Sequence, residues 1–155
     1  MESKGAHRNA FDIKSAIMPI VDFVRVYALK HHIEETNTWE RIYKLRVKQV
    51  VSQHESDELE KAYSFLMQMR FVQQVNASIN ENSKPDNYLK PKNLTNIEQT
   101  TLKEIFKHVE KFQSKMKFDY IGAWSRKKVS IAAYTINCVT KFAMKFLITS
   151  TKLKS

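Results

Sequence analysis

Glycine, proline and cysteine are scarce in this chain of 155 residues, which has 2 Gly, 3 Pro and 1 Cys. The shortage of glycine excludes a Gly-rich loop that cradles phosphate groups. A single cysteine, Cys138, cannot form a disulfide framework and is typical of a reducing compartment. The N-terminal segment MESKGAHRNAFDIK is too polar for a signal peptide. We therefore expect a cytoplasmic protein.

Apolar and basic residues are plentiful. The chain is 43% hydrophobic, and its formal net charge is +10. The first 83 residues hold 11 basic and 11 acidic side chains, whereas the remaining 72 hold 15 basic and 5 acidic ones. Such asymmetry is found where a protein contacts nucleic acid or a membrane, but it is as often a solvated face. The length favours one domain with a well-packed core.

Hydrophobic periodicity predicts four helices, over residues 16–32, 38–51, 52–80 and 95–117. Three pairs of polar residues at capping-box spacing mark where the last three begin, namely Asn37 with Glu40, Ser52 with Glu55, and Thr95 with Glu98. The loop over 81–95 has two prolines and an Asp-Asn pair. We expect an all-α fold, an antiparallel four-helix bundle with an additional C-terminal helix.

That additional helix is predicted over residues 129–149. It is about as long as a membrane span, but Lys141 and Lys145 interrupt it, so we do not expect a span. It could rest on a membrane surface, although packing on the bundle or on a second copy of the chain is the preferred interpretation. The expected division is a flexible lead-in over 1–11, a helical domain over 12–121 and a basic extension over 122–155.

The first predicted helix is apolar from Ile20 to Leu29, with only Asp22 and Arg25 interrupting the run. A helix that is apolar on nearly every side is typical of the interior of a bundle. Pro19 suits a first helical turn, where a missing N–H has no partner to lose. A buried Arg25 needs a counter-charge, which is either an internal acid or a ligand.

Six spaced motifs agree with one known family. They are DIK at 12–14, PIVDFVRVYAL at 19–29, TNTWER at 36–41, AYSFLMQMR at 62–70, PDNY at 85–88 and LKEIF at 102–106. Over residues 11–121 the chain resembles a helical domain of certain bacterial signal-transduction proteins. In those proteins the helical domain follows a nucleotidyltransferase domain, and cyclic-nucleotide-binding and cystathionine-β-synthase-type domains are commonly present as well. The catalytic domain of those proteins is similar to that of PII-protein uridylyltransferases. The family usually has a His-Gln pair on its third helix, where this chain has Gln73 and Gln74.

The resemblance implies a helical bundle that takes part in substrate binding beside a nucleotidyltransferase active site. The partner would be a catalytic domain, fused or adjacent, which would supply Mg²⁺ and the nucleoside triphosphate. This chain has no Gly-Ser dipeptide for a triphosphate, and Asp57-Glu58-Leu59-Glu60 is interpreted as a helix start that complements the helix dipole. We therefore expect no catalytic residue, metal or cofactor in this chain, and no nucleotide transfer by the chain alone.

The candidate substrate-binding residues are polar positions in or beside the matched motifs: Arg25, Asn37, Arg41, Arg70, Gln74, Asp86 and Asn87. Arginine suits phosphate or carboxylate because its planar guanidinium donates two parallel hydrogen bonds and stays charged when partly buried. Structural alternatives stay open. Asn37 could cap a helix, the Asp86-Asn87 pair could form a turn, and each arginine could pair with an internal acid. If Arg25 and Arg70 shared one groove near Asn37 and Asp86, they would form a cationic pocket for an anionic group of a substrate or nucleotide.

Two other function classes are possible. Arg25 with His31 or His32 matches the loose Arg–His spacing of HEPN-like helical ribonucleases, in which these residues position a phosphate and move protons. Histidines at a helix end are more often dipole complementation. A row of Lys107, Lys111 and Lys115 could instead contact nucleic acid. We do not expect that partner, because no aromatic residues lie among the lysines.

Overall fold

The computed structural model describes residues 10–79 and 87–121, which are mostly helical. In chain order the elements are β1 (Phe11–Asp12), α1 (Ile13–Lys30), α2 (Thr38–Val47), α3 (Gln53–Ile79), β2 (Tyr88–Leu89), the 3-10 helix η1 (Pro91–Asn93) and α4 (Asn96–Ile121). The prediction of a predominantly helical chain is confirmed. The predicted extra helix over 129–149 and Cys138 lie outside the described residues. None of the described helices is long and apolar enough to cross a membrane.

Side-chain caps begin the helices. The Ser52–Glu55 and Thr95–Glu98 pairs are reciprocal capping boxes, with the Ser52 backbone N 2.8 Å from Glu55 Oε2 and the Thr95 N 2.7 Å from Glu98 Oε2. At the start of α1, Asp12 Oδ1 accepts a hydrogen bond from the Lys14 backbone N at 3.0 Å. That helix therefore begins at Ile13 rather than at 16. The placement of Pro19 in a first turn is wrong, because Pro19 lies inside α1.

Two helices end without the glycine that usually follows a helix. At the end of α1, His32 has φ 53°, and the Ile33 backbone N donates to the Ala28 carbonyl oxygen at 2.9 Å. At the end of α2, Gln49 has φ 57°, and the Val50 N donates to the Leu45 carbonyl oxygen at 2.9 Å. Both are Schellman motifs, in which a left-handed residue lets the chain reverse and satisfies the last carbonyls.

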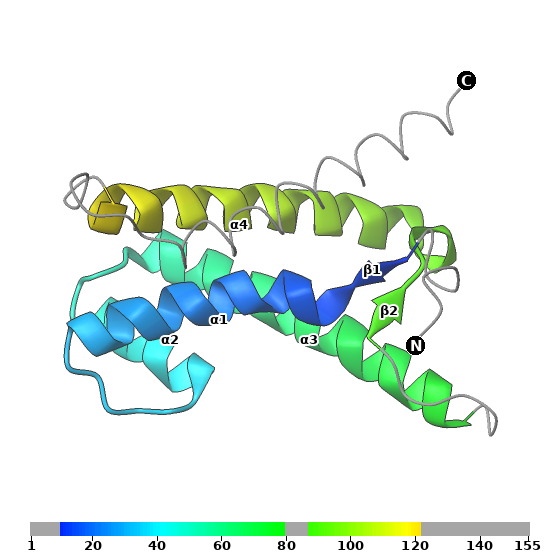
Figure 1. The fold of residues 1–155 in the computed structure, drawn as a ribbon, viewed down its shortest axis with the longest axis horizontal. Coiled ribbons are helices and arrows are strands. Elements are labelled where there is room, and N and C mark those ends of the chain that lie inside the picture. The colour runs from blue at the N-terminus through cyan, green and yellow to red at the C-terminus, as the bar shows by residue number, and fades with distance from the viewer. Residues whose placement is uncertain (1–9, 80–86, 122–155) are drawn as a thin grey trace.

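Helix α1 is the centre of the fold and packs against α2, α3 and α4 (Figure 1). Its Ile13, Ile20, Phe23 and Val24 are fully buried or nearly so. These side chains meet Ile42 and Leu45 from α2, Leu59 and Leu66 from α3, and Leu102 and Val109 from α4 in one hydrophobic core. The helix with the most apolar sequence is therefore the most central one, as the hydrophobic effect leads one to expect.

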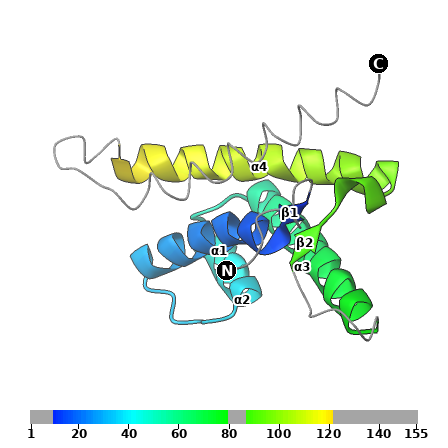
Figure 2. The ribbon, with the colours of Figure 1, turned by 45° about the vertical axis from the view of Figure 1, so that its right-hand side comes forward.

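The antiparallel arrangement expected of the bundle does not hold for α1 and α4. Aromatic contacts between the two helices advance together along both chains: Phe23 lies 5.0 Å from Phe112 and Tyr27 lies 5.6 Å from Tyr120, measured between ring centroids. The two helices therefore run in the same direction. Helix α3 is inclined to α4, and its C-terminal half projects away from the other helices (Figure 2). A regular four-helix bundle is accordingly not confirmed.

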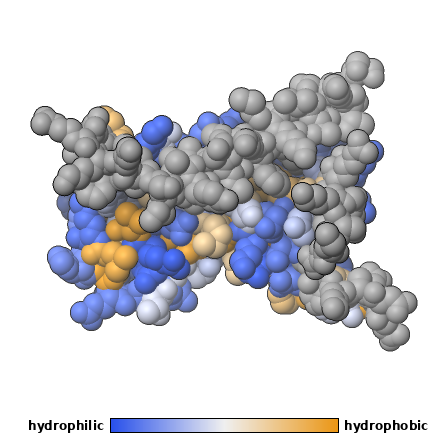
Figure 3. Space-filling view, viewed as in Figure 1, coloured by the Kyte–Doolittle hydropathy of each residue, from blue (hydrophilic) through white to orange (hydrophobic). Residues whose placement is uncertain are grey.

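A short sheet holds the start of α1. Strand β1 pairs antiparallel with β2, with Phe11 opposite Leu89 and Asp12 opposite Tyr88. Phe11 is buried and meets the ring of Phe106 edge-on at 6.3 Å between centroids. Phe11, which the expected lead-in over 1–11 included, therefore belongs to the core. On the surface seen in Figure 3, hydrophobic residues form separate patches between hydrophilic ones.

Candidate functional site

Three of the predicted site residues meet at one end of the molecule. Asn87 Oδ1 accepts a hydrogen bond from Arg70 Nε at 3.0 Å and another from Gln74 Nε2 at 3.3 Å. Arg70 and Gln74 are one turn apart on α3, so their side chains reach the same side of that helix. We call these three residues the Arg70 cluster. Its members come from two segments that are distant in the sequence but adjacent in space.

Backbone bonds fix Asn87 in this position. The Asn87 carbonyl oxygen accepts from the backbone N of Ile13 at 2.9 Å, where α1 begins. Next to it, the Tyr88 carbonyl oxygen accepts from Gln73 Nε2 at 3.1 Å, so the residue that replaces the family histidine ties β2 to α3. Because the backbone is bonded at Asn87 and at Tyr88, the side-chain oxygen of Asn87 is held toward Arg70.

Arg70 retains donors for another group. Within the described residues its hydrogen bond to Asn87 uses only Nε, and the residue is half-buried. A guanidinium carries five N–H donors, so the two terminal nitrogens are available to bind two oxygens of one anion. Asn87 and Gln74 are neutral, and among residues 10–79 and 87–121 no carboxylate pairs with Arg70. The arrangement suits a phosphate or carboxylate group.

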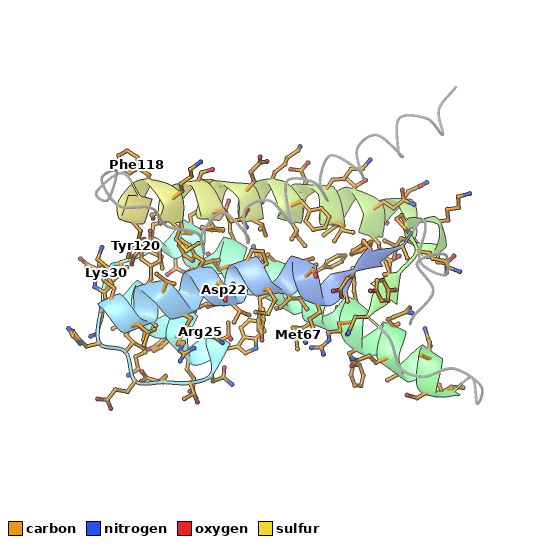
Figure 4. The ribbon with its side chains drawn as sticks, viewed as in Figure 1. Asp22, Arg25, Lys30, Met67, Phe118 and Tyr120 are labelled. Atoms are coloured by element: carbon orange, nitrogen blue, oxygen red, sulfur yellow. The ribbon has the colours of Figure 1, made fainter. Side chains whose placement is uncertain are left out.

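The other predicted residues do not join this cluster. Arg25 is not buried as expected, since its side chain is 51% exposed and its Nη1 lies 4.0 Å from Asp22 Oδ1 (Figure 4). It lies 12 residues along α1 from Ile13, a rise of about 18 Å. Burial raises the pKa of Asp22, and the charge of Arg25 opposes that shift. The single groove postulated for Arg25 and Arg70 is therefore wrong.

Asn37 and Arg41 have structural roles at the corner between α1 and α2. Asn37 Oδ1 accepts from the Trp39 backbone N at 2.8 Å and caps α2, which was the alternative left open for it. Arg41 Nε donates to the carbonyl oxygen of Glu35 and so closes the loop before the helix. The last of the seven residues, Asp86, lies outside the described residues.

The lysine row that suggested nucleic acid is largely paired. Lys107 Nζ lies 2.7 Å from Glu104 Oε1, Lys111 Nζ lies 3.7 Å from Glu58 Oε2, and Lys115 Nζ lies 2.6 Å from Glu55 Oε1. The last two contacts cross from α4 to α3. An ion pair with a carboxylate reduces the positive potential that would attract a phosphate backbone. Lys111 and Lys115 therefore help to join α4 to α3, and the pairing of all three lysines argues against a nucleic-acid surface on α4.

The carboxylates of the Asp57–Glu60 segment are also engaged within the protein. Glu58 Oε1 lies 3.1 Å from His108 Nδ1 and 3.3 Å from His54 Nδ1, while Gln53 Nε2 donates to Asp57 Oδ1. Among the residues that the structure describes, no group of three or more His, Cys, Asp or Glu side chains could hold a metal ion.

The Arg–His pair of the ribonuclease alternative is also dispersed. His31 caps the C-terminus of α1 and His32 is the left-handed residue after it. Arg25 is six residues before His31, about 9 Å of helical rise away, and is paired with Asp22. The histidines serve the helix end, and nothing in the described geometry assembles a proton-transfer site.

A pocket of about 260 Å³ lies beside the Arg70 cluster, on the neighbouring face of α3. Helix α3 forms one wall and the segment from β2 to the start of α4 forms the other. Its apolar lining is Phe65, Met69, Val72, Leu89 and Leu94, and its polar lining is Gln68, Gln73, Asn76, Lys90, Asn93 and Glu98. None of the seven predicted site residues lines this pocket. Its only signal was a run of amides on one face of α3, which also suits a solvated edge.

Comparison with known proteins gives one match. A family model described as "putative nucleotidyltransferase substrate binding domain" matches residues 1–120. No curated protein and no solved structure matches the chain. The match covers every helix that the structure describes except the last residue of α4, and it includes the Arg70 cluster and the pocket.

Proposed function

Because the chain belongs to the family of putative nucleotidyltransferase substrate binding domains, we propose that it binds the substrate of a nucleotidyltransferase without taking part in the chemistry. The catalytic domain would be a separate one, fused or adjacent, as in the bacterial signal-transduction proteins that this chain resembles. That domain would bring Mg²⁺ and the nucleoside triphosphate. The helical domain would hold the acceptor molecule in place, which is the usual contribution of a positioning element to group transfer.

The observation that carries the proposal is the convergence of Arg70, Gln74 and Asn87. Arg70 and Asn87 come from two separate motifs, Gln74 belongs to the glutamine pair on α3, and the three meet through hydrogen bonds of 3.0 and 3.3 Å. The amide oxygen of Asn87 fixes the guanidinium through Nε and leaves its terminal nitrogens for an anionic group of the substrate. A fixed guanidinium loses little conformational freedom when the anion binds, which favours affinity.

The proposal is tested by changing the charge at the cluster while keeping its shape. In Asn87→Asp the side-chain oxygen can still accept from Arg70 and Gln74, but the new carboxylate neutralises Arg70 and repels an anion. Transfer activity is measured with the catalytic domain present, together with the melting temperature of the helical domain. We expect activity to fall about 10- to 100-fold, the equivalent of losing one charge-assisted contact, with the melting temperature unchanged or raised.

Arg70→Gln should lower activity in the same way, and Arg25→Gln is the matched control because Arg25 is exposed and distant. The control should leave activity and melting temperature unchanged, since an exposed ion pair contributes about 0–1 kcal/mol. Normal activity of Asn87→Asp would show that Arg70 only supports β2, and the proposed site would then be wrong.

A further inference from the structure

The pocket between α3 and the β2–η1 segment has the composition of a ligand site in its own right. Met69 and Leu89 are each 7% exposed and form its apolar floor, together with the half-buried Phe65. Its rim carries carboxamides and one lysine, Lys90. Small-molecule pockets commonly combine an apolar lining with a few polar groups that fix the orientation of the ligand. The volume of about 260 Å³ suits one small ligand.

Two amides on opposite walls are available to a ligand. Gln68 stands on α3 and Asn93 ends η1, and within the described part of the chain neither side chain makes a hydrogen bond. A carboxamide offers one hydrogen-bond acceptor and two donors in a plane, which matches the donors and acceptors on the edge of a purine base. The pairing of Asn or Gln with adenine in nucleic-acid recognition uses the same geometry. A flat base between these walls would cover the apolar floor.

Lys90 lies where a charged group of the same ligand would emerge. The Asn93 backbone N donates to the Lys90 carbonyl oxygen at 3.0 Å, which closes a 3-10 turn. Lys90 is the extended residue before η1, and both Lys90 and Asn93 line the pocket. The other ionised residue of the lining, Glu98, is engaged elsewhere, because its Oε2 accepts from the Thr95 N at 2.7 Å and from Thr95 Oγ1 at 2.8 Å.

We infer that this pocket binds an adenine nucleotide, with the base on Met69 between Gln68 and Asn93 and the phosphate at Lys90. The site is distinct from the Arg70 cluster, since none of the three residues of that cluster lines the pocket. The inference goes beyond the proposed function and does not require it. It gives this domain a nucleotide of its own in addition to the anionic substrate held by Arg70.

The test is calorimetric titration of the full chain alone with AMP, adenosine, UMP and inorganic phosphate. AMP should bind saturably. Adenosine should bind about tenfold more weakly because it lacks the phosphate that contacts Lys90, and UMP should bind more weakly because its single ring covers less of the apolar floor than a purine does. Inorganic phosphate should show no saturable binding, because Lys90 alone does not make a phosphate site.

Variants assign the contacts. Asn93→Leu and Gln68→Leu should each weaken AMP binding about tenfold, whereas Lys90→Gln should weaken AMP and leave adenosine unchanged. Gln53→Leu and Lys61→Gln, on exposed positions outside the pocket, are the matched controls, and circular dichroism verifies folding.

Three results would overturn the inference: no saturable AMP binding, equal binding of AMP and inorganic phosphate, or equal AMP affinity in pocket variants and controls. None of them bears on the transfer assay with Asn87→Asp, which needs the catalytic domain. Failure of the nucleotide pocket and failure of the proposed function are therefore distinguishable.

Discussion

Replacing Gln49 by glycine should stabilise this protein. Gln49 has φ 57° in the Schellman motif that ends α2, and its side chain is exposed. A left-handed conformation costs a residue with a Cβ atom about 1–2 kcal/mol, because the Cβ approaches the following carbonyl oxygen. Glycine avoids that cost but gives back about 0.5–1 kcal/mol through the greater freedom of the unfolded chain. The net gain in unfolding free energy should be about 0.5–1 kcal/mol.

Urea denaturation followed by far-UV circular dichroism measures this gain, and the melting temperature should rise by about 1–4 °C for a domain of this size. Gln49→Ala is the matched control, because it removes the side chain and keeps the Cβ. His32→Gly at the end of α1, where φ is 53°, should behave like Gln49→Gly. Equal stability of the Gly and Ala variants at position 49 would refute the reasoning, since the gain is attributed to removal of the Cβ.

Three further predictions concern single contacts in the fold. Tyr27 donates a hydrogen bond to Asp119 Oδ2, and burial together with this bond raises the pKa of the tyrosine. Tyr27→Phe should lower the unfolding free energy by about 1–2 kcal/mol. The double mutant Tyr27→Phe/Asp119→Asn, with the two single mutants, completes a double-mutant cycle that measures the contact. Burial raises the pKa of Glu55, but its bonds with Lys115 and Ser52 outweigh burial and bring it below the ordinary 4.5. The stabilisation by Glu55 is thus present above pH 4.5 and lost as pH falls through the lower folded pKa. In urea titrations the difference in unfolding free energy between the wild type and Glu55→Gln should therefore shrink as the pH is lowered. A difference that does not depend on pH would contradict this assignment. Asn37→Ala should lower stability by about 1 kcal/mol through loss of the α2 cap and leave transfer activity in the folded fraction unchanged, whereas an activity loss at unaltered stability would return Asn37 to the substrate site.

Local features were predictable because they depend on neighbours in the sequence. The capping boxes at Ser52 and Thr95 fixed two helix starts to within a residue or two. Arg25 was misjudged because Met18 and Leu29, which lie on the same exposed stripe of α1, are themselves apolar and 37% and 65% exposed. Their hydrophobicity made the helix look apolar on every side, and sequence alone does not distinguish an exposed Leu from a buried one.

Long-range features could not be predicted from periodicity. Each strand has two residues, too few to show an alternating pattern, and the partners Phe11 and Leu89 are far apart in the sequence. The direction of α4 depends on that pairing, because β2 brings the chain back to the start of α1 before α4 begins. The family motifs did place Arg70, Gln74 and Asn87 in the candidate site, but the hydrogen bonds that join them depend on this same pairing.

The parallel course of α1 and α4 has a consequence for synthesis in the cell. The most apolar helix is made first, and α4, which covers Phe23 and Tyr27, is complete only when Ile121 has been added. At translation rates of about 5–20 residues per second, the roughly 90 residues between the ends of α1 and α4 take about 5–18 s to add. During that interval α2 and α3 can shield only their own side of α1. The nascent chain therefore exposes an aromatic surface that a chaperone can bind, and a slower ribosome prolongs that exposure.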